Sequence, residues 1–193
     1  MSPEVQTDVS PKEYLAFERK AANRNEYVEG KIFAMTGTSR TRNLIVGNII
    51  GELGQQLRGK STEVYAFKMR VKAPAARSYV YPDVVVVCGE PQLEDDYFDT
   101  LLNPTLVVEV LSKSTESYNR LAKSSYYRTI ESLSEYLLVS QEEYRVEQYL
   151  KQADGRWLLS DVRLLEGLIE LTSIGCSLAL RDIYDRITFD EPE

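Results

Sequence analysis

Two acidic residues interrupt the most apolar stretches of this chain. Asp83 lies within YVYPDVVVVC (79–88), and Glu109 lies within TLVVEVL (105–111). A carboxylate in a buried strand is costly unless a partner compensates its charge. A structural ion pair would explain one such carboxylate, whereas a shared cation better explains two on neighbouring strands. The pattern therefore predicts a divalent metal site at Asp83 and Glu109, with a structural ion pair as the alternative.

The residue types in the chain limit which kinds of catalysis and metal binding are possible. The chain has no histidine, which excludes Ser-His-Asp and Cys-His triads, a histidine base and histidine metal ligands. Its two cysteines, Cys88 and Cys176, have apolar neighbours and are predicted to be buried free thiols. Ligation by oxygen alone favours Mg²⁺ or Mn²⁺. We therefore expect chemistry at this site to be assisted by one of these metals.

Other charged residues are candidates for the same site. Glu26 or Glu29, near a predicted hairpin, would supply a third acid, although Glu26 is equally consistent with the hairpin surface and Glu29 with a turn. Lys123 shares a predicted helix face with Arg120 and Tyr127. If that face meets the strand ends, it brings positive charge to a phosphate. The alternative is that Lys123 is a solvated surface lysine.

The two carboxylates need buried strands to hold them. The four valines after Asp83 predict a strand over 79–88 that is buried on both faces. Pro82 cannot donate to a sheet, so this strand must splay there. Residues 105–111 and 135–140 predict two further buried strands.

The remaining elements indicate a mixed α/β domain. Ser10 caps a predicted helix from Pro11 to near Ala22, with Glu13 completing a capping box. The first half of the chain also predicts a hairpin at 26–35 around Glu29-Gly30, a helix through 44–57 ending at Gly59, and strands at 62–67 and 69–73 or one bent strand. The second half predicts a helix from Ser114 or Thr115 to Ile130, a C-terminal hairpin at 144–160, a short strand at 168–171 and a last helix or turn at 180–187. Gly47 and Gly51 are expected to mark close helix packing.

The bulk properties predict one domain over residues 1–193, with an ordered core at about 11–187. No apolar run approaches the roughly 18 residues of a membrane span, and the N-terminal segment does not resemble a secretory signal, so we expect a cytoplasmic protein. The formal net charge of −7 opposes broad nucleic-acid binding unless a local basic rim, a metal or a partner offsets it. The acidic segment 94–96 is expected to be solvated.

The runs YPDVVVVCGEP, NPTLVVEVLSKST, NRLAKSSYYR and SLSEYLLVS together resemble a large bacterial restriction endonuclease family of the PD-(D/E)XK nuclease superfamily. The resemblance extends in order from about Pro11 to Ile187. It implies a restriction-endonuclease-like core, in which helices flank a central mixed β-sheet. It also implies that Asp83 and Glu109 bind Mg²⁺ or Mn²⁺ and that Glu26 adds to the site.

The superfamily lysine is displaced in this chain. Two residues after Glu109, where it usually lies, stands Leu111. The resemblance implies that Lys123 takes its place and orients water or stabilises charge on the phosphate. Lys113 is a second candidate, since it would share a strand face with Glu109.

Three further positions depart from the pattern of the family. Arg42 stands where relatives often carry a histidine, and Asn119 and Ser140 stand where they often carry aspartate. The resemblance implies a metal-dependent endonuclease that acts on nucleic acid, most simply DNA, as a homodimer. The alternatives are a catalytically inactive binding module with this fold and a metal-dependent phosphoesterase for small substrates.

Overall fold

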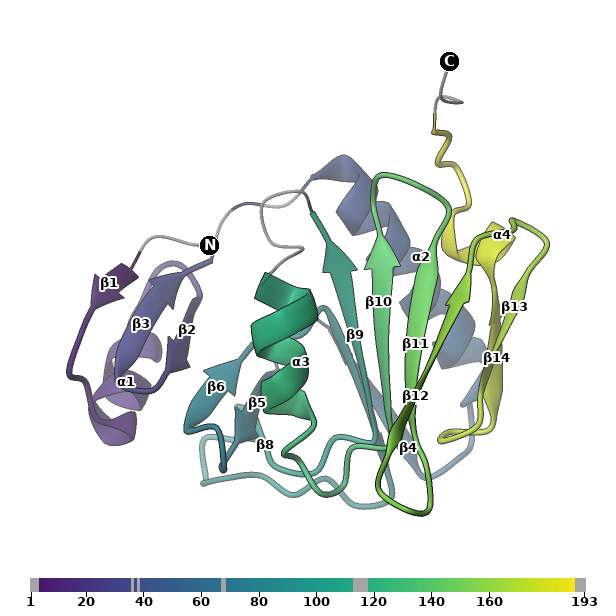
Figure 1. Ribbon diagram of the computed structural model, residues 1–193. Helices are drawn as coiled ribbons and strands as arrows, with labels where there is room; N and C mark the ends of the chain where they lie inside the picture. The colour runs from purple at the N-terminus through teal and green to yellow at the C-terminus, as the bar shows by residue number, and fades with distance from the viewer. Residues whose placement is uncertain (1–3, 36, 38, 67–68, 113–117, 190–193) are drawn as a thin grey trace.

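The computed structural model of the chain describes residues 4–35, 37, 39–66, 69–112 and 118–189. Within these residues the strands form two six-stranded sheets and one two-stranded sheet. Figure 1 shows one six-stranded sheet at the centre of the molecule and the other, which contains the N-terminal strands, beside it. No described helix combines the length and apolarity needed to cross a membrane.

The central sheet has the strand order β12-β11-β10-β9-β7-β4. Strands β9 and β10 run parallel, and the other neighbours run antiparallel. The sheet is therefore mixed, as the sequence predicted. Its strands are β4 (Thr62–Ala66), β7 (Val84–Cys88), β9 (Leu106–Leu111), β10 (Glu135–Ser140), β11 (Val146–Lys151) and β12 (Trp157–Val162).

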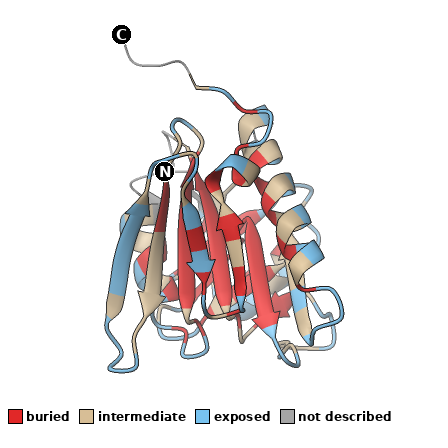
Figure 2. Cartoon of the chain, turned by 90° about the vertical axis from the view of Figure 1, so that its right-hand side faces the viewer, coloured by how far each residue is buried: buried red, intermediate tan, exposed pale blue. Residues whose placement is uncertain are grey.

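Both faces of this sheet are covered, which explains its apolar strands. Helix α2 (Arg40–Gln56), helix α4 (Leu180–Ile183) and the hairpin of β13 (Leu168–Leu171) and β14 (Cys176–Ala179) pack on one face. The π-helical turn η1 (Tyr118–Lys123) and helix α3 (Ser124–Tyr127) approach the other. Figure 2 shows the consequence, because the strands between the two layers are buried along most of their length. The β11–β12 pairing confirms the predicted C-terminal hairpin.

The second sheet has the order β1-β3-β2-β6-β5-β8 and was not predicted as a separate sheet. Helix α1 (Pro11–Glu18) packs against it. The predicted hairpin is present, with positive φ angles at Glu29 and Gly30 in its turn. The strands are β1 (Glu4–Gln6), β2 (Asn25–Val28), β3 (Lys31–Ala34), β5 (Arg70–Ala73), β6 (Ser78–Val80) and β8 (Thr100–Leu101).

Two predicted strands are each divided between the sheets. The expected strand 79–88 splits at Pro82, so that β6 pairs in the N-terminal sheet and β7 in the central one. The splayed backbone expected at Pro82 is therefore a crossing between sheets. Likewise β4 and β5 belong to different sheets, which excludes one bent strand. Cys88, at the end of β7, is exposed, contrary to the prediction, whereas Cys176 is buried.

Several helices are shorter than predicted. The capping box of Ser10 and Glu13 forms as expected, but α1 ends at Glu18. Helix α3 ends at Tyr127. The helix or turn expected at 180–187 is present as α4 to Ile183, followed by a turn. The expected cap residues Ser114 and Thr115 lie outside the described residues.

The packing predicted at two glycines of α2 is wrong. At Gly47 and Gly51 an added Cβ atom would meet no described atom within 4 Å, and both positions are exposed. These glycines therefore lie on the solvent side of the helix. Gly59 does end this region, with a φ of +80°.

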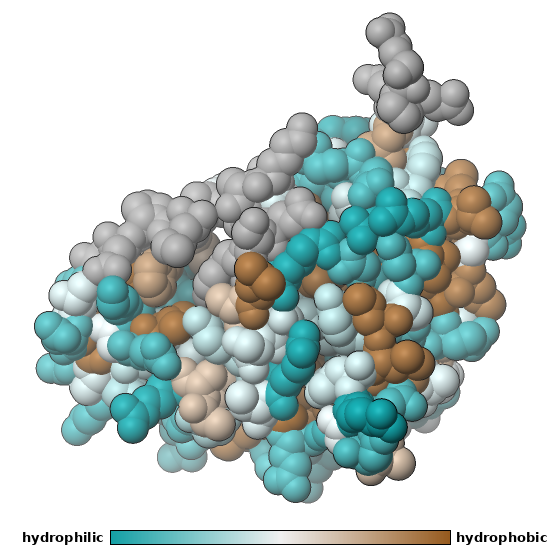
Figure 3. Space-filling view, in the orientation of Figure 1, coloured by the Kyte–Doolittle hydropathy of each residue, from teal (hydrophilic) through white to brown (hydrophobic). Residues whose placement is uncertain are grey.

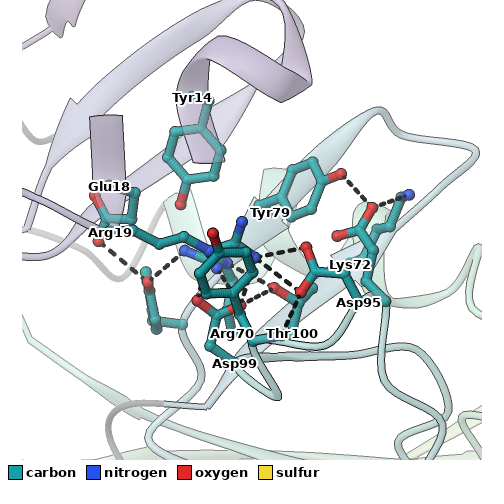
Figure 4. A network of polar contacts seen from close by, with 12 residues as sticks. Tyr14, Glu18, Arg19, Arg70, Lys72, Tyr79, Asp95, Asp99 and Thr100 are labelled. Carbon is teal, nitrogen blue, oxygen red and sulfur yellow. Dashed lines mark hydrogen bonds and ion pairs between the residues drawn. The ribbon is translucent and has the colours of Figure 1, made fainter. Parts of the chain in front are cut away.

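An ion-pair network joins α1 to the acidic loop (Figure 4). It corrects the expectation of solvation for Glu94 and Asp95, whereas Asp96 is exposed as expected. Arg19 binds Asp95 at 2.7 Å and Asp99 at 3.0 Å, and the buried Arg70 binds Asp99 at 2.7 Å. Lys72 likewise pairs with Glu94 at 2.5 Å. The loop is thus fastened to the N-terminal sheet through its own acidic side chains.

We predict that Asp99 gives the protein a specific acid sensitivity. Burial alone would raise the pKa of Asp99, but hydrogen bonds from Arg19 and the charge of Arg70 hold it at about 2. A carboxyl group whose folded-state pKa is depressed stabilises the fold above its unfolded value of 3.8. That stabilisation disappears as pH falls toward 2. The free energy of unfolding of wild type, measured with urea, should therefore fall between pH 3.8 and about pH 2. The free energy of unfolding of Asp99→Asn should fall less over the same pH range.

The matched control is Asp96→Asn, which changes an exposed residue of the same loop. Its stability profile should follow that of wild type. Equal acid profiles for wild type and Asp99→Asn would show that the network does not depend on the charge of Asp99.

Candidate active site

Asp83 and Glu109 lie side by side on neighbouring strands. The register of β7 and β9 pairs Val84 with Val108, and the Asp83 amide donates to the Val108 carbonyl at 3.1 Å. Asp83 is 2% exposed and Glu109 0% exposed. The structure therefore brings together the two buried carboxylates that the sequence singled out, where the chain enters the central sheet.

Glu109 has one satisfied and one unsatisfied oxygen. Its Oε1 accepts hydrogen bonds from Lys123 Nζ at 2.8 Å and from the Tyr127 hydroxyl at 2.7 Å. Its Oε2 is buried and has no hydrogen-bond partner among the described residues. Burial raises the pKa of the Glu109 carboxyl; Lys123 lowers it, and the charges of Asp83 and Glu26 raise it further. An unpaired buried oxygen of this kind requires an explanation.

Lys123 is buried and not a surface lysine. Besides its bond to Glu109, its Nζ lies 2.7 Å from Glu26 Oε1. Burial alone would lower the pKa of Lys123, but these two carboxylates raise it above its ordinary value. Lys123 is the last residue of η1, and π-helical turns are frequent at functional sites.

Glu26 reaches the cluster from the N-terminal sheet. It lies on β2, is buried, and its Oε1 accepts a hydrogen bond from the Tyr81 amide at 3.0 Å. Tyr81 immediately precedes Pro82 at the crossing between the sheets. Glu29 does not join the cluster; it has a φ of +47° in the β2–β3 turn and acts as the turn residue that the sequence allowed.

Asp83 is held by an arginine that the sequence did not identify as its partner. Arg42 donates from Nε to Oδ1 and from Nη2 to Oδ2 of Asp83, both at 2.9 Å. The Val110 amide adds a third bond, to Oδ2, at 2.7 Å. In the sequence, the only sign of this role is that Arg42 stands where relatives often carry a histidine.

The other candidates near the site have different partners. Arg120 forms an ion pair with the buried Glu147 of β11, which Arg145 also contacts at 2.5 Å. The Ser140 hydroxyl accepts the amides of Glu142 and Glu143 and so caps the β10–β11 turn. Lys113 lies outside the described residues, as does the side chain of Asn119.

The five charged groups of the cluster come close to balancing. Glu26, Asp83 and Glu109 face Arg42 and Lys123, which leaves one excess negative charge when all are ionised. Within the described residues no group of three or more acidic, histidine or cysteine side chains has the arrangement of a complete metal cage. Mg²⁺, however, is usually bound by one or two carboxylates and keeps several waters. Asp83 and Glu109, with the unpaired Oε2, fit that kind of cation.

The chain is similar in sequence to a family of known proteins. Residues 11–181 match the profile of the Uma2 family, described as "Putative restriction endonuclease". Two similar proteins come from Synechocystis sp. (strain ATCC 27184 / PCC 6803 / Kazusa). Uncharacterized protein sll1609 is 37% identical over 150 residues, covering 78% of this chain and 85% of that protein. Uncharacterized protein slr1290 is 35% identical over 181 residues, covering 94% of each.

A solved structure shares the fold. It is the crystal structure of "a putative nuclease belonging to DUF820" from Anabaena variabilis ATCC 29413. The TM-score is 0.71, with 15% sequence identity over 91% of this chain and 97% of that one. At this identity the match establishes the architecture, which is restriction-endonuclease-like.

Proposed function

The chain belongs to the Uma2 family, described as "Putative restriction endonuclease", and from that premise we propose that it is a divalent-metal-dependent nuclease that cleaves DNA phosphodiester bonds. The observation that carries the proposal is the buried, unpaired Oε2 of Glu109 beside the buried carboxylate of Asp83. Arg42 and Lys123 offset part of the charge of these carboxylates, and with Glu26 one negative charge remains for a metal cation to balance. We assign the active site to Asp83, Glu109 and Lys123, with Glu26 in support.

Each residue has a distinct role in this proposal. Asp83 and Glu109 would hold Mg²⁺ or Mn²⁺, which when bound polarises a phosphate and favours ionisation of an attacking water. Lys123 keeps its proton between Glu109 and Glu26, and its ammonium group orients that water or stabilises charge on the phosphate. Tyr127 fixes the Glu109 carboxylate through its hydroxyl. Both cationic and anionic groups are thereby positioned before substrate binds.

We also propose that the chain works as one domain and as a homodimer. The crossing at Pro82 and the Glu26–Lys123 ion pair tie the two sheets to one site. Among the described residues β12 pairs with β11 alone, so its outer edge lies open. Figure 3 shows apolar patches near this margin on a largely hydrophilic face. The exposed leucines of β12, β13 and the turn between them are Leu158, Leu159, Leu164 and Leu168.

The proposal predicts metal binding that depends on Asp83. Calorimetric titration of Mn²⁺ into wild type should show a saturable site, and Asp83→Asn should lose it because the amide carries no charge. Wild type should also cleave plasmid or single-stranded DNA only when Mg²⁺ or Mn²⁺ is present. RNA substrates in the same assay distinguish the two nucleic acids.

The matched control is Asp161→Asn, which changes an aspartate on β12 outside the cluster. It should bind Mn²⁺ as wild type does. Equal binding by wild type and Asp83→Asn would contradict the assigned site. Metal binding without cleavage of any nucleic acid would favour a binding module that keeps the fold.

A further inference from the structure

The contact between Arg42 and Asp83 leaves little of the carboxylate for any other ligand. A carboxylate offers about four lone-pair directions. Arg42 takes one on each oxygen, and the Val110 amide takes another on Oδ2. Such two-bond guanidinium–carboxylate contacts are among the strongest side-chain pairings. The residue most suited to bind a metal is therefore already bound to a cation of the protein itself.

The backbone of α2 holds Arg42 in this position. Ser39 caps the helix, and its hydroxyl accepts the Arg42 amide at 3.0 Å. The Ser39 hydroxyl also contacts Gln141, beyond the end of β10, at 2.5 Å. One turn further along, Ile45 and Val46 are fully buried in the core. The guanidinium is thus presented to Asp83 from a fixed helix end, not from a loop.

Arg42 also lies on the solvent side of the carboxylate. Its side chain is 15% exposed, whereas that of Asp83 is 2% exposed. An arginine guanidinium stays protonated in proteins, so Arg42 keeps its positive charge beside Asp83. A divalent cation that approaches Asp83 is therefore repelled by the positive guanidinium, which is bound to both carboxylate oxygens.

We propose that Arg42 is an internal counterion that competes with the catalytic metal for Asp83. This inference rests on the proposed function, because it concerns the metal affinity of the same site. Without metal, Arg42 neutralises Asp83 and stabilises the fold. One lone pair of Oδ1 remains, so a metal ion must either share that oxygen with the guanidinium or displace it. The apparent affinity of the site for metal is therefore lower than the carboxylates alone would give.

The test compares Mn²⁺ binding by wild type, Arg42→Gln and Arg40→Gln in calorimetric titrations. Arg42→Gln is expected to bind Mn²⁺ on the order of tenfold more tightly than wild type, a typical size for coupling between two bound groups. Arg40→Gln should match wild type, since Arg40 is an exposed arginine two residues earlier on the same helix. Arg42→Gln affinity equal to or weaker than wild type would overturn the proposal.

Thermal unfolding gives a second readout that needs no activity. In the presence of a chelator, Arg42→Gln should melt below wild type, because Asp83 is left buried without its cation. Added Mn²⁺ should raise the melting temperature of Arg42→Gln more than that of wild type. If Arg42→Gln does not fold, Arg42→Lys replaces it, because lysine keeps the positive charge. Arg42→Lys is expected to bind Mn²⁺ more tightly than wild type, since one amine cannot occupy both oxygens of Asp83.

The two proposals fail in different ways. Suppose that wild type binds Mn²⁺ through Asp83 and that neither Arg42→Gln nor Arg42→Lys binds it more tightly. That result overturns the competition and leaves the nuclease proposal intact. Absence of Mn²⁺ binding in wild type and in every Arg42 variant overturns both. Binding seen only after Arg42 is replaced supports the competition in its strongest form.

Discussion

Glu109→Gln is expected to slow metal-dependent DNA cleavage by about a thousandfold, the scale at which loss of a key electrostatic group impairs catalysis. The amide keeps the size of the side chain and still accepts the Tyr127 hydroxyl, but it cannot serve as an anionic metal ligand. Lys123 keeps a carboxylate partner in Glu26, at 2.7 Å. The variant should therefore fold, and single-turnover cleavage rates should show the loss.

The control for Glu109→Gln is Glu135→Gln. Glu135 is also 0% exposed, but it lies at the start of β10 and its carboxylate binds Gln148 and Ser173. The same chemical change there should leave cleavage close to wild type. A Glu109→Gln variant that folds and still cleaves at the wild-type rate would remove Glu109 from the active site.

Lys123→Met is expected to lower the free energy of unfolding by about 3–5 kcal/mol, the usual cost of breaking a buried ion pair by removing one partner. Methionine fills most of the volume of the lysine stem but leaves Glu109 and Glu26 facing each other without their shared cation. Urea unfolding at pH 7 should show the loss. Cleavage should fall as well, because the ammonium group is gone.

A second substitution separates the charge effect from packing. The double variant Lys123→Met/Glu109→Gln should recover part of the lost stability, since it removes one of the two uncompensated charges. Lys12→Met, at an exposed position of α1, should change stability little. A loss for Lys123→Met no larger than that for Lys12→Met would show that the buried lysine is not held as a cation.

Residue patterns along the chain predicted the features of the fold that depend on residues close together in the sequence. The valines after Asp83 and the apolar run around Glu109 predicted buried strands, and β7 and β9 are buried. The Ser10–Glu13 capping box and the Glu29-Gly30 turn formed as predicted because each depends on residues within one turn of backbone. The division into two sheets was missed, since Pro82 marks a break but does not indicate which strands pair on either side.

For the site, the sequence by itself determined the two central carboxylates. Asp83 and Glu109 were identifiable because the cost of burying a charge follows from the apolar residues beside it. The partners of these carboxylates were decided only by the tertiary structure. Arg42 meets Asp83 across 41 positions of sequence, and Lys123 of η1 meets Glu26 of β2 in the N-terminal sheet. Spacing constrains side chains that share one helix or strand, whereas these contacts depend on how α2, η1 and β2 pack around β9.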